Sequence, residues 1–427
     1  MREMELKAFF LRYRKRHLWL LALLVLLAAF FALRNVQPVM QAAAPAAAAF
    51  RRQLGRLCGR VPFSVAELLC VLVCVVAAGL LCRLLVLAAK GGRCAVPAAV
   101  RQPLLHLTVL TSVSGGLLGL LSGGAPLGDV LLPWLLAAVV WLLLALLLRQ
   151  EKRRKGYGVF LTTLCCGLTV YTGFCWLWGT AYTLPGFQQQ SGIYAQPVAV
   201  EDLYRVTVYF AEQLNAASER VPWDAKGQLA ASRQQILRES ASVYSGVEES
   251  YPFLKMKQTP PKAIHFSRVM SLLDFTGFYC PFTGESNVNM DSPVCLLPST
   301  VAHELAHQRG IASEQECNFL AILSSTDCGL EDYAYSGWLL GYIHLGNALY
   351  SADRERWETV YGSLREEVRA DLQENNAYWQ QFQNSVVKKA SNTVYDHFLK
   401  GYGVEDGLRS YGTVVDLLVA YYGAAAG

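Results

Sequence analysis

The uneven distribution of charge restricts the fold of this chain more than any other feature. Five stretches are almost free of charged residues, namely 17–34, 66–89, 104–122, 129–148 and 157–178. Each has about the length of the roughly 20 apolar residues that cross a bilayer as one helix. From residue 179 onward, charged residues occur throughout. The sequence therefore predicts a transmembrane region over residues 1–178, embedded in the lipid bilayer, and a globular domain over 179–427.

Basic residues beside the apolar stretches predict the orientation in the cell membrane, because Lys and Arg gather in cytoplasmic loops. Such residues precede the first stretch and lie in the loops 90–101 and 149–155, which indicates that these segments are inside. With five spans, the globular domain is extracytoplasmic. The stretch 104–122 contains three glycines and is the weakest span. If it does not cross, the domain is cytoplasmic.

Two features of the N-terminal part leave alternatives open. The first apolar stretch also suits a cleaved signal peptide, although its length favours a retained anchor. Four arginines, at positions 51, 52, 56 and 60, would lie outside the cell in the five-span arrangement, against the usual charge bias. An amphipathic helix on the membrane surface would accommodate them.

The globular part has mainly helical periodicity. Apolar residues recur at helical spacing over 201–217 and 229–243, whereas 263–290 is strand-like and rich in loops. A helix is expected to open at Ser299 or Thr300 and to end by Gly310. The next helix, 313–325, has Ser313 as its N-cap and Glu316 as partner in a capping box. Longer helices are predicted over 331–350, 354–385 and 407–423. The fold class is therefore mainly α with a small β element.

The motif His303-Glu304-Leu305-Ala306-His307 predicts a zinc site. Histidines four residues apart lie one turn apart on one face of a helix, where both can ligate one Zn²⁺ ion. Bound zinc acidifies its water and polarises a carbonyl group, and Glu304 is positioned to act as the general base. The alternative is a structural helix with two buried histidines.

A third protein ligand is needed, and the sequence offers several. Gly310 follows His307 as in the metzincin motif, but position 313 is Ser where that motif has its third His, so the metzincin class is excluded. Glu314 and Glu316 are two residues apart, so only one of them can face the metal. We favour Glu314, with Asn318 orienting it, over Glu316 or a distant residue such as His344.

The stretch TVAHELAHQRGIASEQECNFLA resembles a gluzincin, in which a helix with a Glu-x-x-x-Asp pattern follows the HExxH helix; here Asn318 stands where Asp is usual. The wider chain resembles an uncharacterised family, a domain of unknown function, of bacterial multi-pass membrane proteins. The matching stretches are VPFSVAELL, WGTAY, TGFYCPFTGESNVN, YSGWL and YDHFLKGYGVEDGLRSYG. This resemblance implies a zincin-like domain with the β element before the HExxH helix, and it implies no particular substrate.

Further residues are candidates for contact with a peptide substrate. Glu285 and Asn287 precede the zinc helix, where a strand of such enzymes often lies along the cleft. Tyr335 and His344 could donate a hydrogen bond to a developing oxyanion. Each of the four has a structural role as its alternative. Cys280 and Cys295 are candidates for a disulfide, with two buried thiols as the alternative.

Together these features predict a membrane-anchored zinc metallopeptidase. The alternative is a non-catalytic sensor or scaffold in which zinc only stabilises the fold, although such a site has no need for Glu304. An intramembrane protease is excluded because charged residues surround the motif. A nucleic-acid partner is not expected, because the globular part has no basic face interleaved with aromatic residues.

Overall fold

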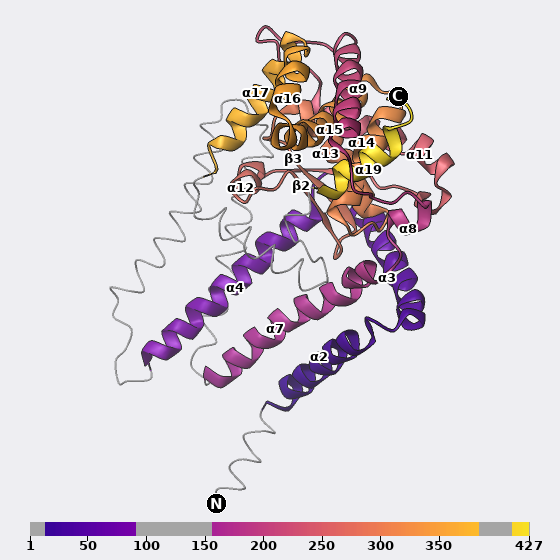
Figure 1. The fold of residues 1–427 in the computed structure, drawn as a ribbon. Coiled ribbons are helices and arrows are strands. Elements are labelled where there is room, and N and C mark those ends of the chain that lie inside the picture. Colours follow the sequence, from indigo (N-terminus) through magenta and orange to yellow (C-terminus); the bar gives the residue numbers. More distant parts are fainter. Residues whose placement is uncertain (1–12, 91–155, 384–411, 427) are drawn as a thin grey trace, which may run out of the picture. The chain divides into compact units, whose positions relative to one another are not determined.

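A computed structural model describes residues 13–90, 156–383 and 412–426 of the 427-residue chain (Figure 1). The predicted spans 104–122 and 129–148 lie outside the described residues. The chain divides into two compact units, one of Met1–Ala32 with Glu67–Cys175 and one of Leu33–Ala66 with Trp176–Gly427. Residues 33–66, predicted as part of the membrane region, therefore belong to the same unit as the globular part.

The described part of the first unit consists of apolar helices. These are α2 (Arg14–Leu33), most of α4 (Val65–Lys90) and most of α7 (Gly156–Leu177). A small apolar cluster joins α2 to α7 through Leu23, Leu161 and Cys165. The expected helices at 17–34, 66–89 and 157–178 are thus confirmed as helices.

Two of these helices are long and apolar enough to cross a membrane. They are Arg14–Leu33 and the Val65–Cys82 part of α4, and only 11% and 17% of their apolar windows are buried inside the protein. The apolar stretch of α7, Leu161–Leu177, is shorter. Helices that are apolar on all sides and little buried by protein are those that a lipid environment suits. Membrane association therefore has support from length, composition and exposure.

The second unit is mainly helical and contains one small sheet. Its longer helices are α3 (Gln37–Cys58), α9 (Val200–Ser218), α13 (Leu297–Gln308), α14 (Glu314–Asp327), α15 (Glu331–Ala352), α16 (Arg354–Gly362), α17 (Glu366–Gln380) and α19 (Gly412–Tyr422). Shorter ones are α8 (Phe187–Ser191), α10 (Arg233–Glu239), α11 (Ser245–Ser250) and α12 (Ser267–Leu272). Single 3-10 turns are η2 (Gly179–Thr183), η3 (Ser240–Ser242), η4 (Pro252–Leu254) and η5 (Val294–Leu296).

The sheet has the strand order β1-β3-β2. Strand β3 (Glu285–Asn289) lies in the middle, parallel to β1 (Lys262–Ile264) and antiparallel to β2 (Gly277–Cys280). Every residue of β3 is buried. The predicted β element before the HExxH helix is therefore present, and β2 is an edge strand.

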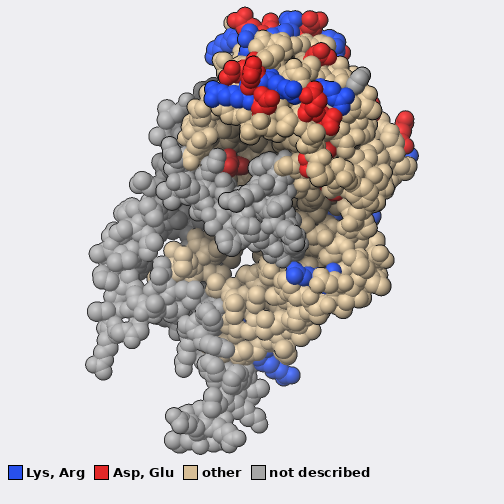
Figure 2. All heavy atoms as spheres, viewed as in Figure 1, with Lys and Arg blue, Asp and Glu red and all other residues tan. Residues whose placement is uncertain are grey.

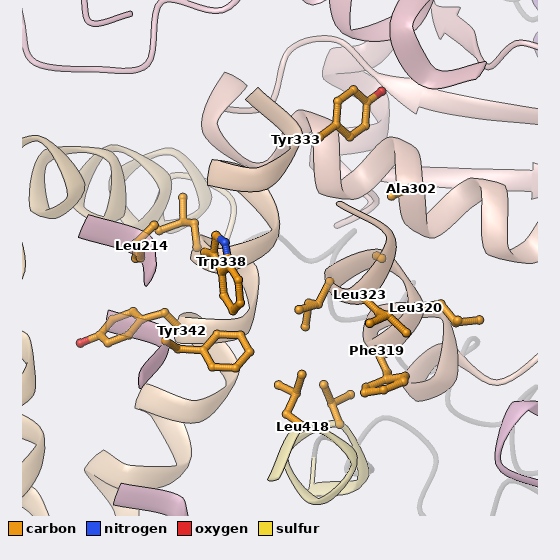
Figure 3. Close-up of a cluster of buried hydrophobic side chains, with 14 of the residues drawn as sticks. Leu214, Ala302, Phe319, Leu320, Leu323, Tyr333, Trp338, Tyr342 and Leu418 are labelled. Carbon is orange, nitrogen blue, oxygen red and sulfur yellow. The ribbon is translucent and has the colours of Figure 1, made fainter. Parts of the chain in front are cut away.

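The core of the second unit lies between the zinc-motif helix and its helical neighbours. Helices α9, α13, α14, α15 and α19 contribute large buried side chains, among them Leu214, Phe319, Trp338 and Leu418 (Figure 3). Apolar residues at helical spacing give α9 one buried face, which packs on α15. Helix α13 is thereby packed on several sides.

Charged side chains gather on the part of this unit formed by α9, α16 and α17 (Figure 2). Ion pairs connect these helices, with Arg356 Nη1 2.8 Å from Glu201 Oε2 and Arg365 Nη1 3.0 Å from Glu219 Oε1. These pairs are largely exposed, so each contributes at most about 1 kcal/mol. The distribution matches a surface that meets water.

Two helix predictions need correction. The zinc-motif helix begins at Leu297, with Pro298 in its first turn, and not at Ser299 or Thr300. Proline suits this position because its missing N–H has no helical partner there. The predicted helix 354–385 is two helices, α16 and α17. The side chain of Asn215 on α9 bonds both backbone groups at the break, accepting from the N–H of Arg365 and donating to the carbonyl of Ser363 at 2.9 Å each.

Candidate metal centre

Two successive helices place the three predicted metal ligands. Helix α13 carries His303 and His307 one turn apart on one face. The chain then turns at Gly310, whose φ of +94° lies in the left-handed region that favours glycine. Ser313 caps the next helix by accepting from the N–H of Glu316. Glu314 is the first residue of α14, and the tight turn returns its side chain to the histidines.

The three side chains converge on one point. His303 Nε2 lies 3.1 Å from Glu314 Oε2, and His307 Nε2 lies 3.5 Å from Glu314 Oε1. One ligand atom from each residue lies within 4.8 Å of the other two. Ligand atoms bound to a zinc ion at roughly 2.0–2.1 Å are a little over ~3 Å apart in tetrahedral geometry. The Glu314 carboxylate therefore lies from both nitrogens at about the spacing that ligands of one metal ion have.

The second nitrogen of each histidine has an oxygen acceptor. His303 Nδ1 lies 2.8 Å from Asn318 Oδ1, and His307 Nδ1 lies 2.9 Å from the carbonyl oxygen of Ile311. These acceptors favour a proton on Nδ1, which leaves the lone pair of Nε2 directed at Glu314 and available to a metal. Asn318 was predicted to orient Glu314. It orients His303 instead, because its position one turn further along α14 brings its amide to the imidazole.

Loss of the Asn318 amide is expected to weaken metal binding without unfolding the protein. In Asn318→Ala, His303 loses the acceptor that selects its tautomer and ring orientation, so zinc affinity should fall by about 10–100-fold. Competition with a zinc chelator would measure this change. Asn347→Ala, at an exposed position of α15, is the matched control and should bind zinc like the wild type. Equal affinities in both variants would contradict the orienting role.

The electrostatics of the site favour a positive charge between the three side chains. Burial alone would raise the pKa of Glu314, but His307 and His303 hold that pKa well below its ordinary value. Burial would lower the pKa of His307, yet Cys317 and Glu314 raise it well above the ordinary value. The ionised Glu314 thus favours a positive charge on or beside the two imidazoles. The Glu314 side chain remains 31% exposed, so solvent can reach it.

Glu304 lies on the same helix and is 3% exposed. Its burial raises its pKa to about 7, near the pH at which a general base works best. The Oε2 atom has no hydrogen-bond partner among the described residues. Strand β2 passes close by, since a Cβ atom at Gly277 would lie 2.5 Å from Glu304 Oε1. A side chain at position 277 would displace the carboxylate, so glycine permits this close approach.

The carboxylate of Glu316, the alternative third ligand, forms hydrogen bonds away from the two histidines. It accepts from the backbone N–H groups of Phe187 at 2.8 Å and Gln188 at 3.1 Å. These are the first residues of α8, so Glu316 caps that helix. The predicted capping box is therefore only half formed, with Ser313 accepting from the N–H of Glu316. The two acidic residues diverge because they lie about 200° apart around α14.

Aromatic residues that follow α7 line the site beside the metal ligands. The Trp178 ring is 5.8 Å from the His307 ring, in an edge-to-face arrangement. Burial and then the negative charge of Glu314 raise the pKa of Tyr182 to about 12, so its hydroxyl stays protonated beside that carboxylate. Neither residue was predicted as part of the site. Their signal in the sequence is the WGTAY stretch, which contributed to the family resemblance.

His344, predicted as a substrate contact, is brought to the site by α15. Burial first, and the charge of His303 next, lower its pKa to about 4. It is therefore neutral at physiological pH. A neutral imidazole near His303 can donate a hydrogen bond without repelling a metal ion.

Helix α3 contacts Trp178, one of the aromatic residues that line the site. Arg51 is only 4% exposed, and its guanidinium donates to the carbonyl oxygen of Leu177 and lies 5.2 Å from the Trp178 ring centre. The same tryptophan packs on Tyr279 of β2. The expected amphipathic helix is therefore present, with Arg51 buried in the second unit and with Arg52 and Arg56 exposed.

Glu285 and Asn287, predicted to meet substrate, are structural. The Glu285 carboxylate accepts from the N–H groups of Val65 and Ala66, at 3.2 and 2.8 Å, and so caps α4. Asn287 accepts from the hydroxyl of Ser64 at 2.6 Å. Both are at most 1% exposed, so neither can reach a substrate. They lie on the central strand, whose side chains are covered on both faces.

Two further predictions are corrected. Tyr335 is buried and donates to Asp371 Oδ2 at 2.8 Å, so its hydroxyl is already used. Cys280 and Cys295 are both buried free thiols and form no disulfide. Cys280 ends strand β2 beside Thr283, whereas Cys295 lies in η5 with Asp371 and Glu374. The different surroundings of the two thiols explain why they do not pair.

Comparison with known proteins identifies the family. The family model described as "Protein of unknown function (DUF3810)" matches residues 110–419, which is more than half of the chain. The chain belongs to the DUF3810 family. The match confirms the predicted membership of an uncharacterised family, and the DUF3810 region contains both α13 and α14. No curated protein and no solved structure matches the chain.

Proposed function

We propose that this protein is a membrane-anchored zinc metallopeptidase. The observation that carries the proposal is the convergence of His303, His307 and Glu314 next to the buried carboxylate of Glu304. A purely structural zinc site is closed by four protein ligands, whereas a catalytic site has three and an open position. Here three protein groups converge, and the partly exposed Glu314 leaves one side open to solvent.

Each residue of the site has its own role in the proposed peptide hydrolysis. Zinc, when bound, would polarise the peptide carbonyl and lower the pKa of a water molecule. Glu304 takes the proton of the attacking water and later transfers it to the leaving amine. Its burial keeps its pKa close to neutrality, which suits both steps. Tyr182 and His344 are neutral residues near the ligands, and we assign them to the stabilisation of the developing oxyanion.

We infer the membrane topology from the assignment of α3 to the second unit. Residues 33–66 and 176–427 form one unit, so they lie on the same side of the membrane. If α2 crosses the membrane, residues 33–66 lie on the side opposite to the N-terminus. The basic residues before α2 indicate an inside N-terminus, so the metal centre is extracytoplasmic.

Metal analysis tests the proposal directly. The purified full-length protein is expected to contain about one zinc ion per chain and to cleave members of a broad peptide library. Removal of zinc by a chelator should abolish cleavage, and added zinc should restore it. Mass spectrometry would measure both metal content and cleavage products. Purified protein without zinc, or cleavage that survives complete zinc removal, would overturn the proposal.

A second candidate, a zinc-stabilised sensor or scaffold, is favoured by the link between α4 and the zinc helix. On β3, Glu285 caps α4, while its neighbour Ser286 donates to the carbonyl oxygen of Glu304 at 2.8 Å. The first residues of α4, Val65 and Ala66, are thus connected to α13 through one strand. This candidate predicts bound zinc without cleavage of any peptide, and the library assay separates the two.

A further inference from the structure

A cavity of about 610 Å³ lies in the second unit, away from the metal ligands. Its wall comes from the segment 237–248, from residues 256–263 and from Arg309 at the end of α13. The volume is in the range of small-molecule sites, which is roughly 300–1,000 Å³. None of the three metal ligands lines it.

The charges around this cavity are not balanced. Arg309 is neutralised by Glu248, with Nη2 2.7 Å from Oε1. Lys262 and the exposed Arg238 also line the cavity, and no carboxylate of the described residues forms an ion pair with either. The cavity therefore carries two positive charges in excess.

Lys262 is the decisive residue. It is only 6% exposed, and its ammonium group donates to the carbonyl oxygen of Val61, which is its one hydrogen-bond partner in the described part of the chain. An ammonium group has three donors, so two remain. A buried charge without a counter-ion is costly, and an anion in the cavity would remove that cost.

We propose that this cavity binds a phosphate group, as a phosphorylated small molecule or as a phospholipid headgroup. Lys262 supplies the buried charge and Arg238 a second cation at the exposed side. Lysine is a common phosphate ligand, and a phosphate offers several acceptors to several donors. The volume exceeds that of one phosphate ion, and Leu237, Met256 and Pro261 supply apolar contacts for the attached organic group.

Occupation of the cavity would act on the zinc helix. Two residues of its wall bond the backbone of α13: the Tyr244 hydroxyl donates to the carbonyl oxygen of Ala302 at 2.8 Å, and Arg309 Nη1 donates to that of Leu305 at 3.1 Å. These bonds flank Glu304 and the first metal ligand. The site itself does not depend on the proposed peptidase activity.

Titration with inorganic phosphate tests the site. The full-length protein in non-ionic detergent, at constant ionic strength, should bind phosphate saturably in calorimetry and unfold at higher temperature. Lys262→Met should weaken binding at least about tenfold, while Lys262→Arg retains most of it. Lys257→Met is the matched control, because Lys257 is exposed and does not line the cavity. Arg238→Gln, at an exposed position that does not endanger folding, should weaken binding several-fold.

Reconstitution into nanodiscs distinguishes a phospholipid headgroup from a phosphorylated small molecule as the source of the phosphate group. In nanodiscs of phosphatidylcholine with added phosphatidylglycerol, a bound headgroup would compete and lower the apparent affinity for free phosphate relative to the protein in the phosphate-free detergent. Equal affinity in nanodiscs and in detergent identifies a soluble phosphorylated ligand. The proposal is overturned if the wild type shows no saturable binding, or if Lys262→Met and Arg238→Gln both bind phosphate as the wild type does.

Discussion

Replacement of Glu304 by glutamine is expected to abolish peptide hydrolysis while leaving zinc bound. Glutamine has the same shape but cannot accept the proton of the attacking water. Loss of a general base lowers the rate by about 10²–10⁴-fold. The carboxylate is not one of the three converging ligands, so the zinc content should stay at the wild-type value. Single-turnover cleavage of a library-derived peptide, with metal analysis of the same sample, measures both effects.

The interpretation of that variant depends on an unaltered fold. Glu304 is buried and its Oε2 has no partner among the described residues, so an amide at this place should cost little stability. Glu366→Gln, at an exposed position in the first turn of α17, is the control and should cleave at the wild-type rate. Equal turnover by Glu304→Gln and wild type would exclude Glu304 as the base and would favour a different reaction or a scaffold role.

Glu314 and Glu316 are expected to give opposite phenotypes, although they are two residues apart. Glu314→Gln removes a negative ligand and leaves the two histidines without their partner. Zinc affinity should fall by more than the roughly 10–100-fold that the loss of an outer partner costs. Activity at limiting zinc should disappear with it, while α8 keeps its cap.

Glu316→Gln should retain zinc but lose stability. The carboxylate that accepts from Phe187 and Gln188 becomes a neutral amide. Hydrogen bonds to a charged group contribute about 1.5–3 kcal/mol each, so the melting temperature should fall by several degrees. Chelator competition and thermal unfolding of both variants measure the two effects. If Glu316→Gln lost zinc and Glu314→Gln kept it, the ligand assignment would be reversed.

The helices around the metal centre were largely predictable, because their signals are local. The capping serine at 313 and the stop at Gly310 each act through backbone geometry within a few residues. The same is true of the apolar periodicity of α9. By contrast, the backbone groups at the break between α16 and α17 are bonded by Asn215, about 150 residues earlier in the chain. A local sequence pattern cannot predict a contact between residues so far apart in the chain.

The predictions of Glu285 and Asn287 as substrate contacts were wrong for a related reason. Glu285 and Asn287 lie in a strand before the zinc helix, and their polarity suggested exposure. Tertiary structure places them on the central strand, where they bond the start of α4 at a sequence separation of more than 200 residues. Polar residues that satisfy a distant helix end look the same in sequence as polar residues that bind a ligand.

By itself, the sequence determined the apolar helices, the mainly helical class and the pair of histidines with its adjacent carboxylate, because each depends on a spacing shorter than one element. Only the tertiary structure decided that Glu314 rather than Glu316 joins the histidines, and that Asn318 supports His303. It also decided that α3, with the buried Arg51, belongs to the unit that holds the candidate metal centre. These outcomes depend on which helix faces meet, and that follows from packing over the whole unit rather than from any one segment.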